Sequence, residues 1–357
     1  MRYFFILFAI AGLLINPSAA EACTGITLKS KDSTTIVART IEWGGSNLNS
    51  QYVVVPRGYT ERSYTPDGVD GMTFTARYGY VGLAVEQKEF IAEGLNEVGL
   101  SAGLFYFPNG EYEKYNAAVR DKSISDLQLV SWLLGECSNV EEVKEAVKKV
   151  HVINIDPRAS TVHWRFAEPS GRQLVLEIIK GELHFYENTL GVLTNSPSFE
   201  WHLTNLNNYV NLFPGTAPNQ QLGNIELSSF GAGSGFLGIP GDVTPPSRFV
   251  RAAFYQASAP QQETALETVF QCFQILNNFD IPVGIEFPLG QVPCDIPSAT
   301  QWTSVTDMRN HVIYYRTMYN SVIRNIDLRS IDFSTVRYRA VSMDGTKRQA
   351  VETIKIE

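Results

Sequence analysis

Apolar and polar residues alternate in short runs over much of the chain, which is the pattern of half-buried β-strands. Residues 24–30 place Ile26 and Leu28 on one face, and residues 34–41 form a second, β-branched run. The intervening Lys31-Asp32-Ser33 has the composition of a turn, so the two runs predict a hairpin. Further strands of this kind are expected at residues 52–55, 72–78, 82–85, 89–92 and 100–105.

Other segments have apolar residues at helical spacing. Ser125 or Asp126 can cap a helix over residues 127–134, and Asn139 can cap the next helix. More helices are predicted at residues 199–210, 248–257 and 264–277, with Arg248 opening its helix. Strands are expected at residues 161–167, 173–180, 183–187, 192–194, 301–307, 312–319, 336–342 and 350–356.

The order of these elements indicates the fold class. Strands come in long consecutive runs with helices grouped between them, which favours an α+β protein of packed antiparallel sheets covered by helices. A doubly wound parallel fold would alternate strand and helix. No linker, repeat or low-complexity tract marks a boundary, so residues 23–357 are expected to form one domain.

The first 22 residues have the composition of a secretory signal peptide. Arg2 supplies a positive charge, an apolar run covers residues 3–15, and Ala20 and Ala22 form an A-x-A cleavage pattern. The apolar run is shorter than the roughly 20 residues of a membrane span, and no later stretch reaches that length. We therefore expect an exported protein, periplasmic or secreted, whose mature chain starts at Cys23.

Composition and charge exclude several classes of function. A net charge of −8, without a Lys/Arg cluster, gives no electrostatic footprint for nucleic acid. The histidines have no metal-ligand spacing, and His163 is expected to be a satisfied core residue. The glycines of residues 233–238 match G-x-G-x-x-G, but the prolines that follow exclude a dinucleotide site. Cys137 and Cys272 fit buried helix positions. No cofactor and no metal is predicted.

Cys23 is the most informative residue. A free thiol has a pKa of about 8.5 and an α-amino group one of about 7.7–8.0. An N-terminal cysteine therefore combines a nucleophile with a base that can take the thiol proton. Two other interpretations stay open, a lipidation site and an incidental first residue, although Ala20-Glu21-Ala22 lacks the usual apolar residue three positions before a lipidated cysteine.

Polar residues near strand ends can complete such a site. The second strand of the hairpin returns beside Cys23, so Arg39 can stabilise a thiolate and Glu42 can hold the ammonium form of the amine. A solvent-exposed ion pair is the alternative for these two residues. Asn195 follows a predicted strand, where its amide can be an oxyanion donor or a turn residue.

Taken together, these stretches resemble the choloylglycine hydrolase family of bile salt hydrolases and penicillin V acylases, which are N-terminal-nucleophile hydrolases. The amino-acid sequence of these stretches is most similar to that of bile salt hydrolases from Gram-negative gut Bacteroides. The matching stretches occur in the family's order and cover nearly all of the mature chain: Cys23-Thr24-Gly25, Ala38-Arg39-Thr40-Ile41-Glu42, Glu93-Gly94-Leu95-Asn96-Glu97, Ala102-Gly103-Leu104, Gly191-Val192-Leu193-Thr194-Asn195-Ser196-Pro197 and Gly241-Asp242-Val243-Thr244-Pro245-Pro246-Ser247-Arg248.

The resemblance implies a four-layer αββα sandwich and a set of site residues. Cys23 is the nucleophile, Arg39 lies by the thiol, Asn195 serves the oxyanion hole, and Arg248 is the second active-site arginine. Glu42 stands where the family usually has Asp. Members are typically tetramers, with the segment around residues 203–240 projecting to a neighbour. The position that is Asn in many bile salt hydrolases and Tyr in penicillin V acylases falls on Phe105 or Tyr106.

The expected activity is hydrolysis, through a thioester, of the amide that joins a bile acid to glycine or taurine. Candidates for the apolar slot that a sterol needs are Ile41, Trp43, Phe105, Tyr106 and Val162. Penicillin V acylase activity is the nearest alternative. An exported sterol- or acyl-binding protein with an inert cysteine, or a lipidated surface protein, belongs to a different class.

Overall fold

In the computed structural model, residues 21–155, 160–288 and 290–356 are described, and most of the signal peptide prediction therefore lies outside them. Two antiparallel sheets face each other. The first has the order β1-β2-β16-β17-β18 and the second β13-β12-β11-β8-β7-β6-β3-β19. The first sheet consists of β1 Glu21–Lys29, β2 Thr35–Trp43, β16 Thr300–Asp307, β17 Val312–Thr317 and β18 Asn320–Asp327.

The second sheet is built from the central part of the chain. Its strands are β3 Gln51–Val55, β6 Tyr80–Ala84, β7 Ile91–Asn96, β8 Ser101–Tyr106, β11 Val162–Ala167, β12 Gln173–Ile179, β13 Glu182–Glu187 and β19 Arg339–Ser342. Short pairs lie outside the two sheets: β4 Thr60–Arg62 with β5 Thr73–Thr75, β9 Ser123–Ser125 with β10 His151–Ile153, and β14 Gln220–Leu222 with β15 Ile225–Leu227.

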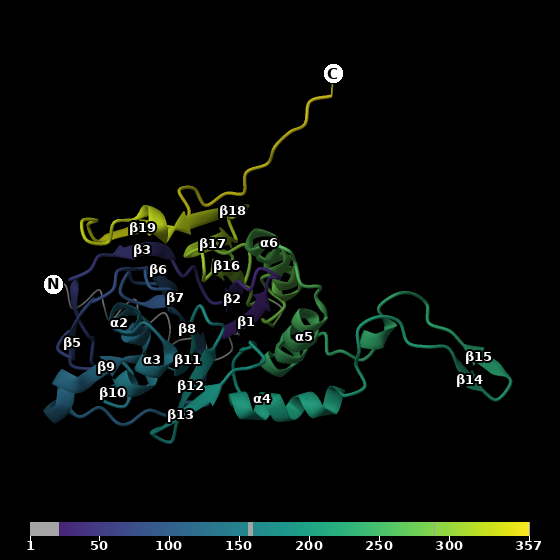
Figure 1. Cartoon of the computed structure of the whole chain (residues 1–357), viewed down its shortest axis with the longest axis horizontal. Coiled ribbons are helices and arrows are strands. Elements are labelled where there is room, and N and C mark those ends of the chain that lie inside the picture. The colour runs from purple at the N-terminus through teal and green to yellow at the C-terminus, as the bar shows by residue number, and fades with distance from the viewer. Residues whose placement is uncertain (1–20, 156–159, 289, 357) are drawn as a thin grey trace.

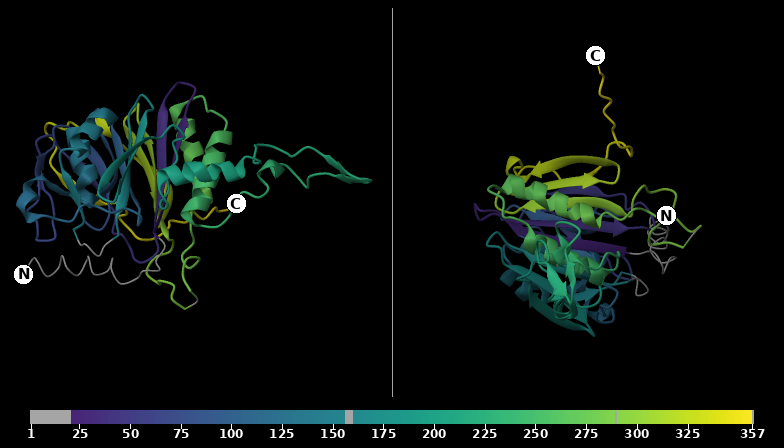
Figure 2. Two further views of the ribbon diagram at one scale, coloured as in Figure 1. Left: turned by 90° about the horizontal axis from the view of Figure 1, so that it is seen from below. Right: turned by 90° about the vertical axis from the view of Figure 1, so that its right-hand side faces the viewer.

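Helices cover the outer face of each sheet, so the order of layers is helix, sheet, sheet, helix (Figure 2). α2 Leu129–Glu136 and α3 Val140–Val147 lie on the side of the larger sheet. α5 Pro245–Ser258 packs on β1, and α6 Ala265–Leu276 on β2 and β16. This is the four-layer αββα sandwich that the family resemblance implied, and it agrees with the α+β order of elements. The remaining helices are α4 Phe199–Asn205 and the 3₁₀ turns η1 Ala117–Lys122, η2 Asp126–Gln128, η3 Leu206–Tyr209, η4 Ser234–Phe236, η5 Asn277–Phe279 and η6 Leu328–Ser330.

Local signals set several of these boundaries as predicted. Lys31-Asp32-Ser33 turns the chain between β1 and β2, with Ser33 at a φ of 68°. The Asn139 side chain caps α3 by accepting from the backbone N–H groups of Glu141 and Glu142. Thr264 and Glu267 form a reciprocal capping box at the start of α6, which satisfies two amide donors that the helix leaves unpaired.

Some predicted elements need correction, and one strand was missed. The helix expected to open at Arg248 starts at Pro245, because proline suits the first helical positions, where no N–H acceptor is needed. Residues 350–356 are no strand; they run away from the body as an exposed tail without a partner strand (Figure 1). β18 was missed because Asn320–Asp327 is an edge strand of mixed polarity, and edge pairing comes from the neighbouring strand rather than from periodicity.

A long excursion of the chain, residues 210–240, leaves the body between α4 and α5 and carries β14 and β15 at its far end (Figure 1). We call it the arm. Several of its apolar side chains are exposed: Val210, Phe213, Leu222, Ile225, Leu227, Phe230 and Leu237.

Candidate active site

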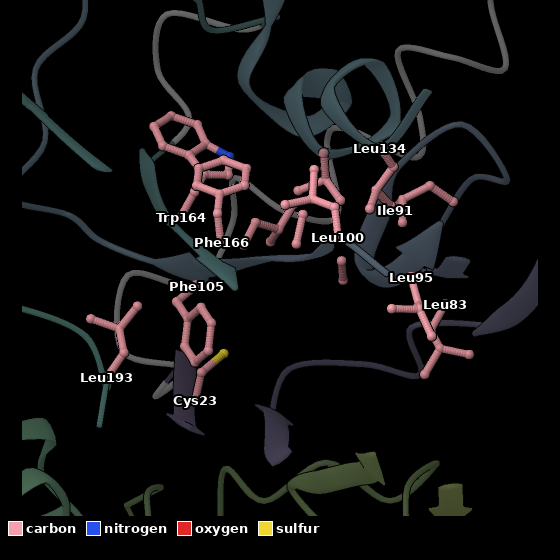
Figure 3. Close-up of a cluster of buried hydrophobic side chains, with 14 of the residues drawn as sticks. Cys23, Leu83, Ile91, Leu95, Leu100, Phe105, Leu134, Trp164, Phe166 and Leu193 are labelled. Atoms are coloured by element: carbon pink, nitrogen blue, oxygen red, sulfur yellow. The ribbon is translucent and has the colours of Figure 1, made fainter. Parts of the chain in front are cut away.

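Cys23 lies on β1 at the interface of the two sheets. It pairs in register with Ile41 of β2, and its side chain is only 4% exposed. Gly25, two residues further along β1, exchanges backbone hydrogen bonds with Leu193, and this bridge brings the segment that carries Asn195 to the cysteine. Figure 3 shows the Cys23 side chain beside the Phe105 ring.

Arg39 contacts the thiol directly. Its Nη2 lies 2.8 Å from Cys23 Sγ, and its other donors bind backbone carbonyls: Nη1 those of Ala92 at 3.0 Å and Leu104 at 2.5 Å, and Nε that of Thr40 at 3.2 Å. The guanidinium also lies 4.1 Å from the Phe105 ring centre. A fully buried arginine with this many partners has its charge fixed in one place.

Opposing effects act on the Cys23 thiol. Burial raises its pKa above the usual value and the Glu42 charge adds to that, while Arg39, the Tyr106 backbone N–H and Arg248 lower it. The groups that favour the thiolate come from three elements: Arg39 on β2 and the Tyr106 N–H on β8 contact the sulfur, and Arg248 on α5 acts through its charge. A thiolate is the nucleophilic form of cysteine, so this arrangement suits covalent catalysis.

Asn195 and Arg248 organise the main chain of Cys23. Asn195 Oδ1 accepts from the Cys23 N at 2.9 Å, and its Nδ2 donates to the Tyr106 carbonyl at 2.8 Å. Arg248 donates to the Cys23 carbonyl at 2.5 Å and to Asn195 Oδ1 at 2.7 Å. Its remaining bonds go to Thr24 Oγ1 and the Val243 carbonyl. Arg248 thus joins β1, the Asn195 segment and its own helix.

Glu42 is buried opposite Ala22, the residue before Cys23 in the chain. Its Oε1 accepts a long, 3.4 Å hydrogen bond from Thr300, and among the described residues its Oε2 has no hydrogen-bond partner. Burial raises the pKa of Glu42 to about 8, although Arg248, Thr40 and Arg39 oppose the shift. An unpaired carboxylate oxygen therefore lies where a cation could be held.

The residues predicted to line an apolar pocket differ in how far they are exposed. Phe105 is fully buried, with its ring between Gly25 and Arg39, so it supports the arginine and presents no surface to a ligand. Ile41 and Val162 are also buried, and Val162 pairs with Tyr106. Trp43 and Tyr106 are partly exposed. The position beside the sulfur is Tyr106, through its backbone N–H.

Two buried histidines support the Asn195 segment, a role that the sequence did not indicate. His163 stacks on Phe107 and contacts Glu177 at 3.0 Å and the Thr194 carbonyl at 3.2 Å, as a satisfied core histidine should. His202 contacts the Asn195 carbonyl at 2.8 Å. His163 reaches this segment from β11, 31 residues away in sequence, while His202 lies on α4, only seven residues after Asn195.

Comparison with known proteins agrees with this geometry. Residues 23–341 match the model of the linear amide C–N hydrolases, choloylglycine hydrolase family. The chain belongs to this family. The match starts at Cys23 and includes every polar residue described above.

Relatives of known activity cover nearly the whole chain. A bile salt hydrolase/transferase of Clostridium perfringens is 32% identical over 86% of this chain and 92% of its own. A solved conjugated bile acid hydrolase of the same species, with a cysteine replaced by alanine, has a TM-score of 0.80 at 29% identity, covering 93% and 100%. A penicillin V acylase of Pectobacterium atrosepticum is 24% identical over 94% of this chain and 89% of its own.

The structural neighbours show an N-terminal-nucleophile hydrolase fold, and the family makes this chain a linear amide C–N hydrolase. In the described ranges, no three His, Cys, Asp or Glu residues gather as metal ligands would. None of the helices in those ranges combines the length and apolar character needed to traverse a bilayer.

Proposed function

We propose that this protein is a bile salt hydrolase that cleaves the amide between a bile acid and glycine or taurine, with Cys23 as its N-terminal nucleophile. The observation that carries the catalytic part is the 2.8 Å contact between Arg39 and the Cys23 sulfur, with the Cys23 nitrogen held at Asn195. The substrate class is supported by the bile salt hydrolase relative, which covers most of both chains.

The mechanism needs Cys23 to be the first residue, so we infer that a signal peptide is removed after Ala22 and that the protein is exported. The Cys23 nitrogen then becomes an α-amine, still facing Asn195 Oδ1. Removal of Ala22 opens the space opposite Glu42, whose unpaired oxygen can accept from the new ammonium group. Glu42 is one methylene longer than Asp, which lets it reach across that space.

The reaction then balances in two steps. The α-amine takes the thiol proton, the thiolate attacks the amide carbonyl, and the α-ammonium protonates the departing nitrogen, leaving a thioester and free glycine or taurine. The amine next takes a proton from water, which attacks the thioester and releases the bile acid and the thiol. Asn195 Nδ2 has a second hydrogen for the oxyanion, and the Tyr106 backbone N–H lies at the sulfur.

One assay panel tests the proposal. The mature chain should release glycine from glycocholate and taurine from taurocholate, and Cys23→Ala should abolish both activities while circular dichroism and thermal unfolding stay unchanged. Undiminished hydrolysis by Cys23→Ala would refute the mechanism. Penicillin V belongs in the same panel, because a penicillin V acylase relative makes it the second candidate substrate.

Intact-mass analysis of the exported protein tests the processing. A mass that begins at an unmodified Cys23 is expected. A diacylglycerol adduct would show a lipidated surface protein instead, and a properly processed chain without hydrolysis would favour a binding protein.

We also propose that the protein forms a homotetramer through the arm. Exposed Phe230 and Leu237 on a segment that leaves the body would be covered by a neighbouring copy. Sedimentation should give a tetramer, and Phe230→Glu with Leu237→Glu should dissociate it. A monomer in the unaltered protein would contradict this assembly.

A further inference from the structure

A buried charged cluster lies behind Arg39, away from the reacting groups. Glu93 on β7 and Arg165 on β11 are 1% exposed, and Arg165 Nη2 lies 2.6 Å from Glu93 Oε1. Glu93 Oε2 is 3.8 Å from Arg39 Nη1, a longer contact. The carboxylate is therefore turned toward Arg165, although both arginines are within reach.

The sheet is built to allow this pair. Glu93 and Arg165 both pair in register with Gly103, which lies on β8 between their strands. A side chain at position 103 would project toward Glu93, since a β-carbon there would lie 2.2 Å from Glu93 Oε2. Only glycine leaves the space that the pair needs to meet across the intervening strand. The glycine in Ala102-Gly103-Leu104 is thus explained by the Glu93–Arg165 pair and not by any contact with the catalytic residues.

The Glu93–Arg165 ion pair is not expected to contribute much to the stability of the fold. Arg165 Nε and Nη1 and Glu93 Oε2 have no hydrogen-bond partner among the described residues. The attraction within a buried ion pair offsets the desolvation penalty only when the remaining polar atoms are also hydrogen-bonded. Replacing such a pair by apolar residues is often neutral or stabilising for the fold. A role in the site explains the cluster better than a role in the core. The Phe105 ring lies between the two arginines, with its centre 4.1 Å from the Arg39 guanidinium carbon and 5.9 Å from that of Arg165.

We propose that Glu93 and Arg165 are positioning residues for Arg39, and that Arg165 holds the Glu93 carboxylate so that Arg39 keeps its charge for the Cys23 sulfur. The two cations and one anion of this cluster contribute a net single positive charge next to the thiolate. Without Arg165, Glu93 neutralises Arg39. Without Glu93, two cations face the thiolate. The inference rests on the proposed role of Cys23.

Opposite charge changes must therefore act oppositely on the thiol. Glu93→Gln should shift the midpoint of thiolate formation to lower pH and Arg165→Met to higher pH, each by about one unit. The double variant has the charge balance of the natural protein, so its midpoint should return to that of the unaltered chain. The other groups that act on the thiol, Glu42, Arg248 and the Tyr106 N–H, are unchanged in all three variants, as is Asn195, which holds the Cys23 nitrogen.

The measurement is alkylation of Cys23 by iodoacetamide as a function of pH, read on the N-terminal peptide by mass spectrometry. A Cys294→Ser background removes the exposed thiol, and Cys137 and Cys272 are buried. Arg324→Gln is the matched control. Arg324 lies on β18, at the opposite edge of the sheet from β1, and the substitution breaks its 3.0 Å pair with Asp344, so it should lower stability without moving the midpoint.

The proposal is supported if the pH midpoint of thiolate formation is lowest in Glu93→Gln, intermediate and equal in the natural protein and the double variant, and highest in Arg165→Met. Shifts in the same direction, or none beyond that of Arg324→Gln, would overturn it. If Arg165→Met does not fold, Glu93→Gln and the double variant still decide, because the pair of neutral residues leaves no unpaired buried charge. Alkylation reports the thiolate without turnover, so failure of the proposed function would show separately, as absence of hydrolysis by the mature chain or as retained hydrolysis by Cys23→Ala.

Discussion

Arg248 gives the strongest single test of how the site is held together. Its donors point in three directions: Nε to the Val243 carbonyl, Nη1 to the Cys23 carbonyl and Thr24, and Nη2 to Asn195. Lysine keeps the charge but has one nitrogen, so at least two directions lose their donor. An orphaned buried acceptor costs about 1–3 kcal/mol, which predicts a loss of about 2–6 kcal/mol for Arg248→Lys.

The activity should fall as well. Cys23 and Asn195 lose the group that fixes their relative position, and a displacement of reacting groups by about 1 Å can cost about 10²-fold in rate. We therefore expect kcat/KM for glycocholate to fall by about 10²-fold, measured by release of glycine, with urea unfolding giving the stability loss.

Arg251, one turn further along α5, is the matched control. It is also buried, but a single nitrogen, Nη1, binds both of its carbonyl partners, Pro240 at 2.8 Å and Asp242 at 2.7 Å. A lysine nitrogen can take that place, so Arg251→Lys should cost about 1 kcal/mol or less and leave kcat/KM unchanged. The reasoning is refuted if Arg248→Lys keeps kcat/KM within threefold of the natural enzyme, or if the two variants lose equal stability.

Two other residues give independent predictions. Asn195→Asp keeps the shape of the side chain but removes the Nδ2 donor and sets an oxygen against the Tyr106 carbonyl. The value of kcat/KM should therefore fall by about 10²–10³-fold. A loss under tenfold would contradict an oxyanion role. For Glu42, the folded-state pKa of about 8 lies above the ordinary value of 4.5, so the folded form binds the extra proton, and stability is lost as pH rises from 4.5 to 8. In a chain that keeps Ala22, Glu42→Gln should therefore reduce the fall in Tm between pH 5 and pH 8; an equal fall would show that Glu42 is not the titrating group.

Local patterns were enough for much of the fold. The β1–β2 hairpin, the cap of α3, the position of α6 and the α+β layering follow from turn residues, an N-cap and periodicity. The hairpin alone places Arg39 near Cys23, since both strands meet across a short turn. Residues 350–356 misled the prediction because their alternation has no strand to pair with.

The remaining site depends on contacts between distant segments. Asn195 and Arg248 meet Cys23 over more than 170 residues of sequence. The family motifs were therefore needed to assign Arg248 and to decide between the oxyanion and turn interpretations of Asn195. Phe105 was expected to face substrate, yet its ring supports Arg39, because the sheet register decides which side chains face the interior. The Glu93–Arg165 pair likewise requires the register at Gly103, which no local pattern encodes.

The central claim is that the amide is cleaved through a thioester on an N-terminal Cys23. Its most direct test is mass spectrometry of the mature enzyme, acid-quenched within the first turnovers of glycocholate. The account predicts a cholyl adduct on the peptide that begins at Cys23, labile to hydroxylamine and absent from Cys23→Ala. Hydrolysis without this adduct on the natural enzyme, together with retained activity in Cys23→Ala, would contradict it.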